Sequence, residues 1–244
     1  MVLSPEEKAA NRAAFRAMSL PQKAEYIFAY YKLALVLALV AIVALGSGAR
    51  YLLTHKNPTL YFACVNVVPD EKASTSLTTG FIEHLGESPR RTEVVCYPDL
   101  YLSSNADSQS HQYAYASKLK LLASIDAEQL DVVLMNQEAY DLLSASGYLL
   151  DLGETCTGDL ALPAAEMHRL TTNTIVLSDN MVEVELGEAD AYEAETTEAA
   201  NALMVSDLTP FASLPDDEPL YLGIIGNTPR LQTSVAYLTY VLSL

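Results

Sequence analysis

The chain has 244 residues, a formal net charge of −17 at pH 7 and a pI near 4.4. So acidic a chain lacks the basic surface that nucleic-acid binding requires, and we expect no nucleic acid among its partners. Its three cysteines are too few for the disulfide scaffold of a small secreted protein.

The strongest signal is an apolar run near the N-terminus. Residues 33–45 contain no polar side chain, and small residues extend the run to Ala49 before Arg50 ends it. Tyrosines border the run on both sides, as is typical of membrane interfaces. A bilayer core about 30 Å thick is crossed by about 20 helical residues. We therefore predict a transmembrane helix over 33–53, with the membrane as a partner through these residues.

Charge asymmetry predicts the orientation of this helix. Residues 1–32 carry five lysines and arginines against three glutamates, a net charge of +2, which leaves −19 for the rest of the chain. Basic residues stay on the cytoplasmic side, so we expect residues 1–32 in the cytoplasm and the C-terminal part outside the cell membrane. A cleaved signal peptide is the alternative, with Ser47-Gly48-Ala49 as the cleavage site, but the segment before the run is long for one.

After a linker over 54–58, the sequence alternates strand and helix patterns. Apolar, strand-like runs begin at Thr59, Thr92 and Asp131. Apolar residues recur at helical spacing over 75–85, 112–125 and 137–146. This order predicts an α/β domain over 59–244 with a mainly parallel sheet and flanking helices.

The C-terminal half predicts more strands and one more helix. Two β-rich runs, 174–178 and 181–186, flank Asp179-Asn180, which favours a β-hairpin with a two-residue turn. We expect this hairpin to be an appendage of the sheet or the remnant of a second lobe. Further strands are expected at 202–206 and 220–225, and a last helix at 230–242.

Cys64 and Cys96 lie in two of the strand-like runs. Burial there predicts free, unreactive thiols. A Cys64–Cys96 disulfide is the alternative, and it requires neighbouring strands in a suitable register. Cys156 is expected to lie alone in a loop.

Three motifs in the outer domain carry a family resemblance. They are Asp131-Val-Val-Leu-Met-Asn136, Gly147-Tyr-Leu-Leu-Asp-Leu152 and the segment 219–230. They resemble the extracellular solute-binding proteins with the type II periplasmic binding fold, in which similar strand, helix and turn segments recur. The resemblance spans 59–152 and 200–244. It implies a bacterial envelope protein for transport that captures a small-molecule solute or docks on a transporter.

The region between the matched segments limits this reading. Residues 153–199 are too few for a second lobe of several strands with covering helices. We therefore expect the equivalent of one lobe, with a cleft that encloses a solute only weakly. An envelope protein–protein interaction domain that has lost solute binding is the alternative function.

Ligands of open α/β sheets bind beyond the carboxyl ends of the strands. For the expected strands, this rule selects ligand-binding candidates at Asn66, Asp99, Tyr101, Asn136, Gln137, Asn227 and Thr228. Tyrosine would stack on a ligand, while amides and short polar side chains would form hydrogen bonds to it. For Asn136, capping of the helix that follows it is favoured over contact with a ligand.

No catalytic motif is found in the sequence. It has no phosphate-binding glycine loop, no paired-histidine zinc signature and no glycine-flanked nucleophilic serine. The four histidines lack ligand spacing, and the acidic stretch 183–198 lacks the pattern of a calcium loop, which favours a solvated face. We expect no enzymatic activity, no metal and no cofactor.

Overall fold

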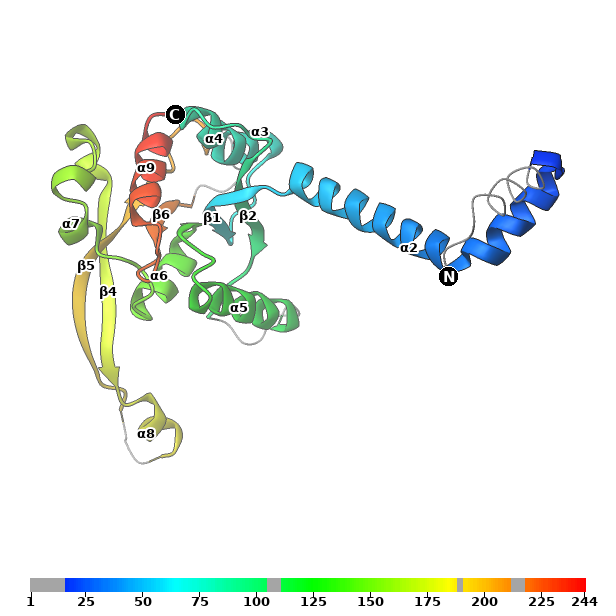
Figure 1. Cartoon of the computed structure of the whole chain (residues 1–244). Helices are drawn as coiled ribbons and strands as arrows, with labels where there is room; N and C mark the ends of the chain where they lie inside the picture. Colours follow the sequence, from blue (N-terminus) through cyan, green and yellow to red (C-terminus); the bar gives the residue numbers. More distant parts are fainter. Residues whose placement is uncertain (1–15, 105–110, 188–190, 212–217) are drawn as a thin grey trace. The chain divides into compact units, whose positions relative to one another are not determined.

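The computed structural model describes residues 16–104, 111–187, 191–211 and 218–244. The chain divides into two compact units, Met1–His55 and Lys56–Leu244. The first unit contains the helix α2 (Leu20–Thr54), and the second contains a β-sheet with its helices (Figure 1).

The N-terminal apolar run forms part of α2, a continuous helix of 35 residues. Only residues 33–49 of this helix lie between the charges of Lys32 and Arg50, fewer than the about 20 residues that match a bilayer core. Among the residues that the structure describes, no helix is both long enough and apolar enough to cross a membrane. The predicted transmembrane helix over 33–53, with its membrane and signal-anchor character, is therefore wrong.

Six strands form one mixed sheet in the order β2-β1-β3-β6-β5-β4. β1 (Asn57–Val65) pairs in parallel with β2 (Thr92–Leu100) and with β3 (Val132–Met135). The pairs from β3 through β6 (Tyr221–Ile224) and β5 (Ala194–Met204) to β4 (Leu170–Asp179) are all antiparallel. The fold is α/β as expected, but the prediction of a mainly parallel sheet is corrected to a mixed one.

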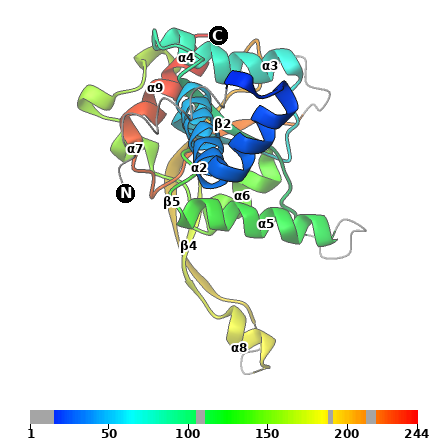
Figure 2. The same ribbon diagram turned by 45° about the vertical axis from the view of Figure 1, so that its right-hand side comes forward.

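Helices cover both faces of the sheet (Figures 1 and 2). One face packs against α9 (Leu231–Leu242) and against a continuous helical segment. That segment consists of α3 (Glu71–Thr75), a π-helical turn (Ser76–Gly80) and α4 (Phe81–His84). The other packs against α5 (His111–Asp126) and α6 (Gln137–Ala145). Successive strand residues alternate between the two cores, as the pleat requires: Phe62 and Leu134 face α9, whereas Ala63 and Val133 face α5 and α6. The short helices α7 (Leu152–Thr155), Gly158–Leu160 and Ala164–Arg169 lead into β4.

Buried polar groups tie the helices to the sheet. The Tyr237 hydroxyl donates to the carbonyl of Leu77 at 2.9 Å, and its ring meets Phe81 edge-on. The fully buried carboxylate of Asp131 accepts from the backbone N–H of Tyr61 and from Nε of Arg230, each at 2.8 Å. These bonds fix α9 and the start of β3 in the fold, because a buried polar group without a partner is costly.

The edge strand β4 is held by side chains of α6. The Tyr140 hydroxyl lies 3.0 Å from the carbonyl oxygen of Thr171, and the Ser144 hydroxyl donates to the carbonyl of Thr174 at 2.9 Å. Asn201 of β5 links the two hydroxyls, since its amide accepts from Tyr140 and donates to Ser144, each at 2.8 Å. All three side chains are buried.

β4 and β5 continue past the body of the sheet as a two-stranded arm, which carries α8 (Met181–Glu185) at its end (Figures 1 and 2). A hairpin was expected here, but its return strand is β5, and residues 181–186 form a helical turn instead. The side chain of Asn180 closes the end of the arm: its Nδ2 donates to the carbonyl of Ala191 at 2.9 Å, and its Oδ1 accepts from the backbone N–H of Glu193 at 2.7 Å. The hairpin belongs to the main sheet and is not a separate appendage.

All three cysteines are free. Cys64 is buried as predicted, but Cys96 is only partly buried, because β2 is the other edge strand of the sheet. The register places Cys96 opposite Phe62 and leaves Cys64 two residues further along β1, so the two thiols interact diagonally across the strands but form no disulfide. Cys156 lies in the bend that follows α7, outside regular secondary structure, and it is buried.

Candidate functional site

The carboxyl ends of β1 and β3 bring two of the predicted site residues together. Asn66 follows β1 with a positive φ of 58°, a conformation that asparagine tolerates better than most residues. Its amide donates to the carbonyl of Leu102 at 2.7 Å and accepts from the backbone N–H of the same residue at 2.8 Å. The amide also lies 3.2 Å from Oδ1 of Asn136. Asn66 therefore pins the segment after β2 to the end of the sheet.

Asn136 and Gln137 lie beside Asn66, at the start of α6. The Asn136 side chain caps this helix by accepting from the backbone N–H of Ala139 at 3.1 Å, and it donates to the carboxylate of Glu218 at 3.0 Å. Gln137 accepts from the hydroxyl of Tyr221 and donates to the carboxylate of Asp141. These amides are already engaged in holding the sheet edge together, so the helix-capping reading of Asn136 is confirmed.

The other predicted residues lie elsewhere. Because β6 runs antiparallel to β3, the turn after β6 lies at the other end of the strands, away from Asn66 and Asn136. There Asn227 donates to the carbonyl of Ile125 at 2.8 Å, and Thr228 donates to the carboxylate of Asp131. Asp99 lies within β2, and Tyr101 follows that strand. Residues 105–110, which follow Tyr101 along the chain, lie outside the described residues.

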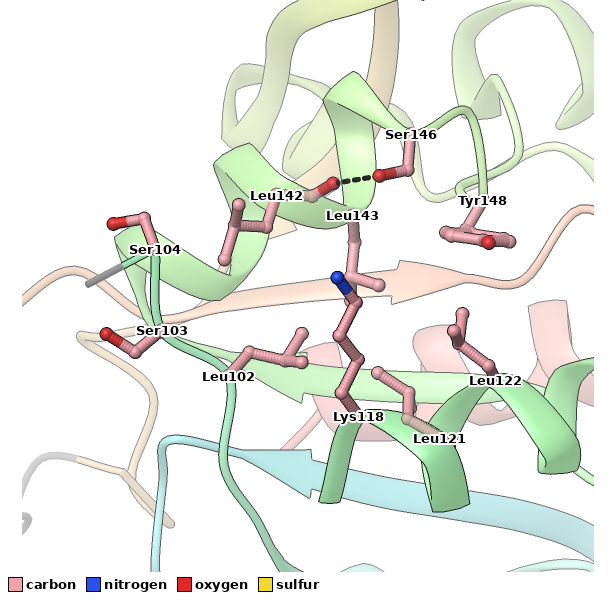
Figure 3. A pocket seen from close by; sticks show the side chains of 10 residues that line it. All are labelled: Leu102, Ser103, Ser104, Lys118, Leu121, Leu122, Leu142, Leu143, Ser146 and Tyr148. Carbon is pink, nitrogen blue, oxygen red and sulfur yellow. Dashed lines mark hydrogen bonds between the residues drawn. The ribbon is translucent and has the colours of Figure 1, made fainter. Parts of the chain in front are cut away.

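A pocket of about 240 Å³ lies next to the segment 102–104, which Asn66 holds in place. Helices α5 and α6 and the side chain of Tyr148 form its other walls (Figure 3). On one side of it, Glu138 accepts hydrogen bonds from the backbone N–H of Ser104 at 2.8 Å and from the hydroxyls of Ser104 and Ser103. The Ser104 N–H in particular holds the pKa of Glu138 below its ordinary value. The position of segment 102–104 is therefore set by Asn66 on one side and by Glu138 on the other.

The sequence did not reveal the pocket. Its lining helices contribute leucines at helical spacing, which is the same pattern that predicts core packing. Lys118 borders the pocket, but its position in an amphipathic helix does not distinguish it from any other surface lysine. No residue type at these positions signals that two helices leave a space between them.

The end of the arm is a second unusual surface. We define the arm tip as residues 177–187 and 191–195. It exposes large apolar side chains although it lies beyond the two hydrophobic cores. They are Leu177, Met181, Val182, Leu186 and Tyr192.

The structure also bears on metal chemistry. Within the described ranges, no three or more His, Cys, Asp or Glu side chains are grouped closely enough to hold a metal ion. His168 bonds to the carbonyl of Ala165 at 2.8 Å, and the ring of His84 packs against that of Tyr240. Both histidines thus have local structural roles.

No family model matches this chain, and no curated protein or solved structure matches it either. The resemblance to extracellular solute-binding proteins therefore stays a prediction.

Proposed function

We propose that this chain is a binding module that docks on another protein through its arm tip. The observation that carries the proposal is the exposure of large apolar side chains on a structured projection. Val182 and Leu186 are 64% and 68% exposed, and three further apolar side chains accompany them. Apolar patches of this kind on a folded surface mark interaction sites more often than chance exposure does.

The charge around the arm tip defines the chemistry of the partner. Residues 170–229 contain no lysine, arginine or histidine, whereas Asp179, Glu183, Glu185, Glu193 and Glu195 lie on or beside the tip. We infer that the partner has an apolar groove flanked by lysines or arginines. Like charges disfavour the contact of two arm tips, so a second copy of the same surface does not fit.

The arm tip is organised before it binds. Asn180 joins the two sides of the tip through its backbone and both side-chain atoms, and the N–H of Met181 bonds to Asp179 at 3.2 Å. A surface that is already ordered loses less conformational entropy on binding. The described residues form one mixed sheet, whereas the cleft of a two-lobed solute-binding protein lies between its lobes, and this also supports a protein partner for the module.

Site-specific photo-crosslinking in the source cells tests this proposal. A benzophenone amino acid at Leu186 should form an adduct with another protein, whereas the same group at Leu85, an exposed leucine of the same unit, should not. The double substitution Glu183→Lys and Glu185→Lys should abolish the adduct. With the purified partner, affinity should fall as salt is raised, because the exposed charges are screened.

The outcomes are decisive in both directions. Equal adducts at both positions, adducts only between copies of this chain, or adducts that survive the charge reversal would refute docking through the arm tip. Retention of the far-ultraviolet circular dichroism spectrum in each variant would show that the domain is folded.

A further inference from the structure

The pocket beside α5 and α6 has an apolar floor that is built into the core. Leu121 and Leu143 are 1% and 2% exposed and belong to the core on this face of the sheet, together with Leu102. Leu122 and Leu142 are only partly buried and extend the apolar surface to the pocket wall. Figure 3 shows these side chains converging from the two helices and from the segment after β2.

Lys118 brings one positive charge to this apolar surface. Its stem runs along the leucines, and its Nζ points into the space between α5 and α6 (Figure 3). Three other cations of this unit have partners: Arg169 pairs with Glu166 and Asp207, Arg230 pairs with Asp131, and Lys120 lies over the ring of Tyr97. Lys118 forms no ion pair with any residue that the structure describes.

The polar groups on the other side of the pocket are already used. The hydroxyls of Ser103 and Ser104 donate to Glu138, and that of Ser146 donates to the carbonyl of Leu142. These serines therefore offer little to an anion, and Glu138 repels one. Lys118 is the one cationic side chain among the residues that line the pocket, so a negative charge is best placed beside it.

We propose that this pocket binds a small amphiphilic monocarboxylate, with the alkyl tail on the leucines and the carboxylate on Nζ of Lys118. A 150 Å³ apolar cavity accommodates benzene, so a pocket of about 240 Å³ holds roughly ten non-hydrogen atoms. Octanoate has this size and this chemistry. The site is independent of the arm tip, and neither proposal depends on the other.

Isothermal titration calorimetry of the chain in detergent-free buffer tests the site with three probes of eight carbons each: octanoate, 1-octanol and octylammonium. We expect saturable one-to-one binding of octanoate, weaker binding of octanol and the weakest binding of octylammonium. Lys118→Met keeps the apolar stem and removes the charge. Because Lys118 is exposed and water screens its charge, the substitution should weaken octanoate binding by about threefold to fivefold and leave octanol binding unchanged.

Two further variants locate the site. Lys120 lies on the same helix but does not line the pocket, so Lys120→Met should leave octanoate affinity unchanged. Leu142→Phe adds volume to a partly buried wall residue and should weaken octanoate and octanol alike. Equal octanoate affinity in Lys118→Met and the unsubstituted chain, equal affinity for octanoate and octylammonium, or no saturable binding of octanoate would overturn the proposal. The thermal unfolding midpoint of each variant shows that it is folded.

Discussion

Arg230, at the start of α9, pairs with the fully buried carboxylate of Asp131 at the start of β3, with 2.8 Å between Nε and Oδ2. The two residues are far apart in sequence, and the guanidinium also lies over the ring of Tyr61. This ion pair links the last helix to the centre of the sheet.

We predict that Arg230→Ala destabilises the domain strongly. Removing the cation leaves a buried carboxylate without its charged partner, which costs about 3–5 kcal/mol of unfolding free energy. Urea denaturation followed by circular dichroism measures the change. Asp207→Ala is the matched control: Asp207 is 65% exposed and its partner Arg169 keeps the pair with Glu166, so this loss should cost about 1 kcal/mol or less. Equal costs for the two variants would contradict the role of the buried pair.

The substitution Gly80→Ala should have opposite effects on stability in the presence and in the absence of the Tyr240 hydroxyl. A Cβ at Gly80 would collide with the hydroxyl of Tyr240, which itself donates to the carbonyl of Ser76 at 2.8 Å. Gly80→Ala should therefore destabilise the protein by about 1–3 kcal/mol, as overpacking does. In a Tyr240→Phe background the nearest obstacle is gone, and the same change should stabilise the helix by about 0.5–1 kcal/mol. Thermal or urea unfolding of all four proteins gives the sign, and a change of the same sign in both backgrounds would exclude this collision.

Asn66 should tolerate glycine better than alanine. Both substitutions remove the three side-chain hydrogen bonds to Leu102 and Asn136. Glycine adopts the positive φ of 58° without strain, whereas alanine does not, so Asn66→Ala should cost about 1 kcal/mol more than Asn66→Gly. Urea unfolding measures the difference. If the two variants have the same stability, backbone strain at this position is unimportant.

The thiols should react in a fixed order. The hydrogen bond with Cys96 and burial raise the pKa of Cys64, whereas the same contact lowers the pKa of Cys96, which is partly exposed. Burial raises the pKa of Cys156. Because the thiolate is the reactive form, iodoacetamide should label Cys96 first, and its rate should begin to rise at a lower pH than the rates of the other two. Mass spectrometry of the labelled chain gives the order, and first labelling of Cys64 would contradict it.

Apolar patterns predicted the central elements of the fold well. The helix expected over 112–125 is α5 (His111–Asp126), and the one expected over 137–146 is α6 (Gln137–Ala145). The strand beginning at Asp131 is β3 with a shift of one residue. These segments are buried on one or both faces, so their sequences carry the periodicity of the packing.

The pattern failed where pairing, not burial, determines the structure. Residues 181–186 alternate apolar and acidic side chains like a strand, yet they lie at the end of an arm with no partner strand and form a helical turn. Conversely, the Glu- and Thr-rich start of β5 gives no strand signal and becomes a strand by pairing with β4. Apolar patterns do not predict whether a strand runs parallel or antiparallel to its neighbour. For that reason Asn227 and Thr228 were expected at the wrong end of the strands.

The side chains of α6 that bond to β4 have a consequence for self-assembly. An edge strand rich in β-branched residues, without lysine or proline, is a template onto which a foreign chain can add and begin a fibril. The Ser144 hydroxyl donates to the carbonyl of Thr174, and the Tyr140 hydroxyl lies 3.0 Å from the carbonyl of Thr171, so α6 covers two carbonyls of this strand. A small cluster of buried hydroxyls thus protects the inner part of β4 from cross-β growth, and resistance to aggregation during prolonged storage depends on α6 remaining in place.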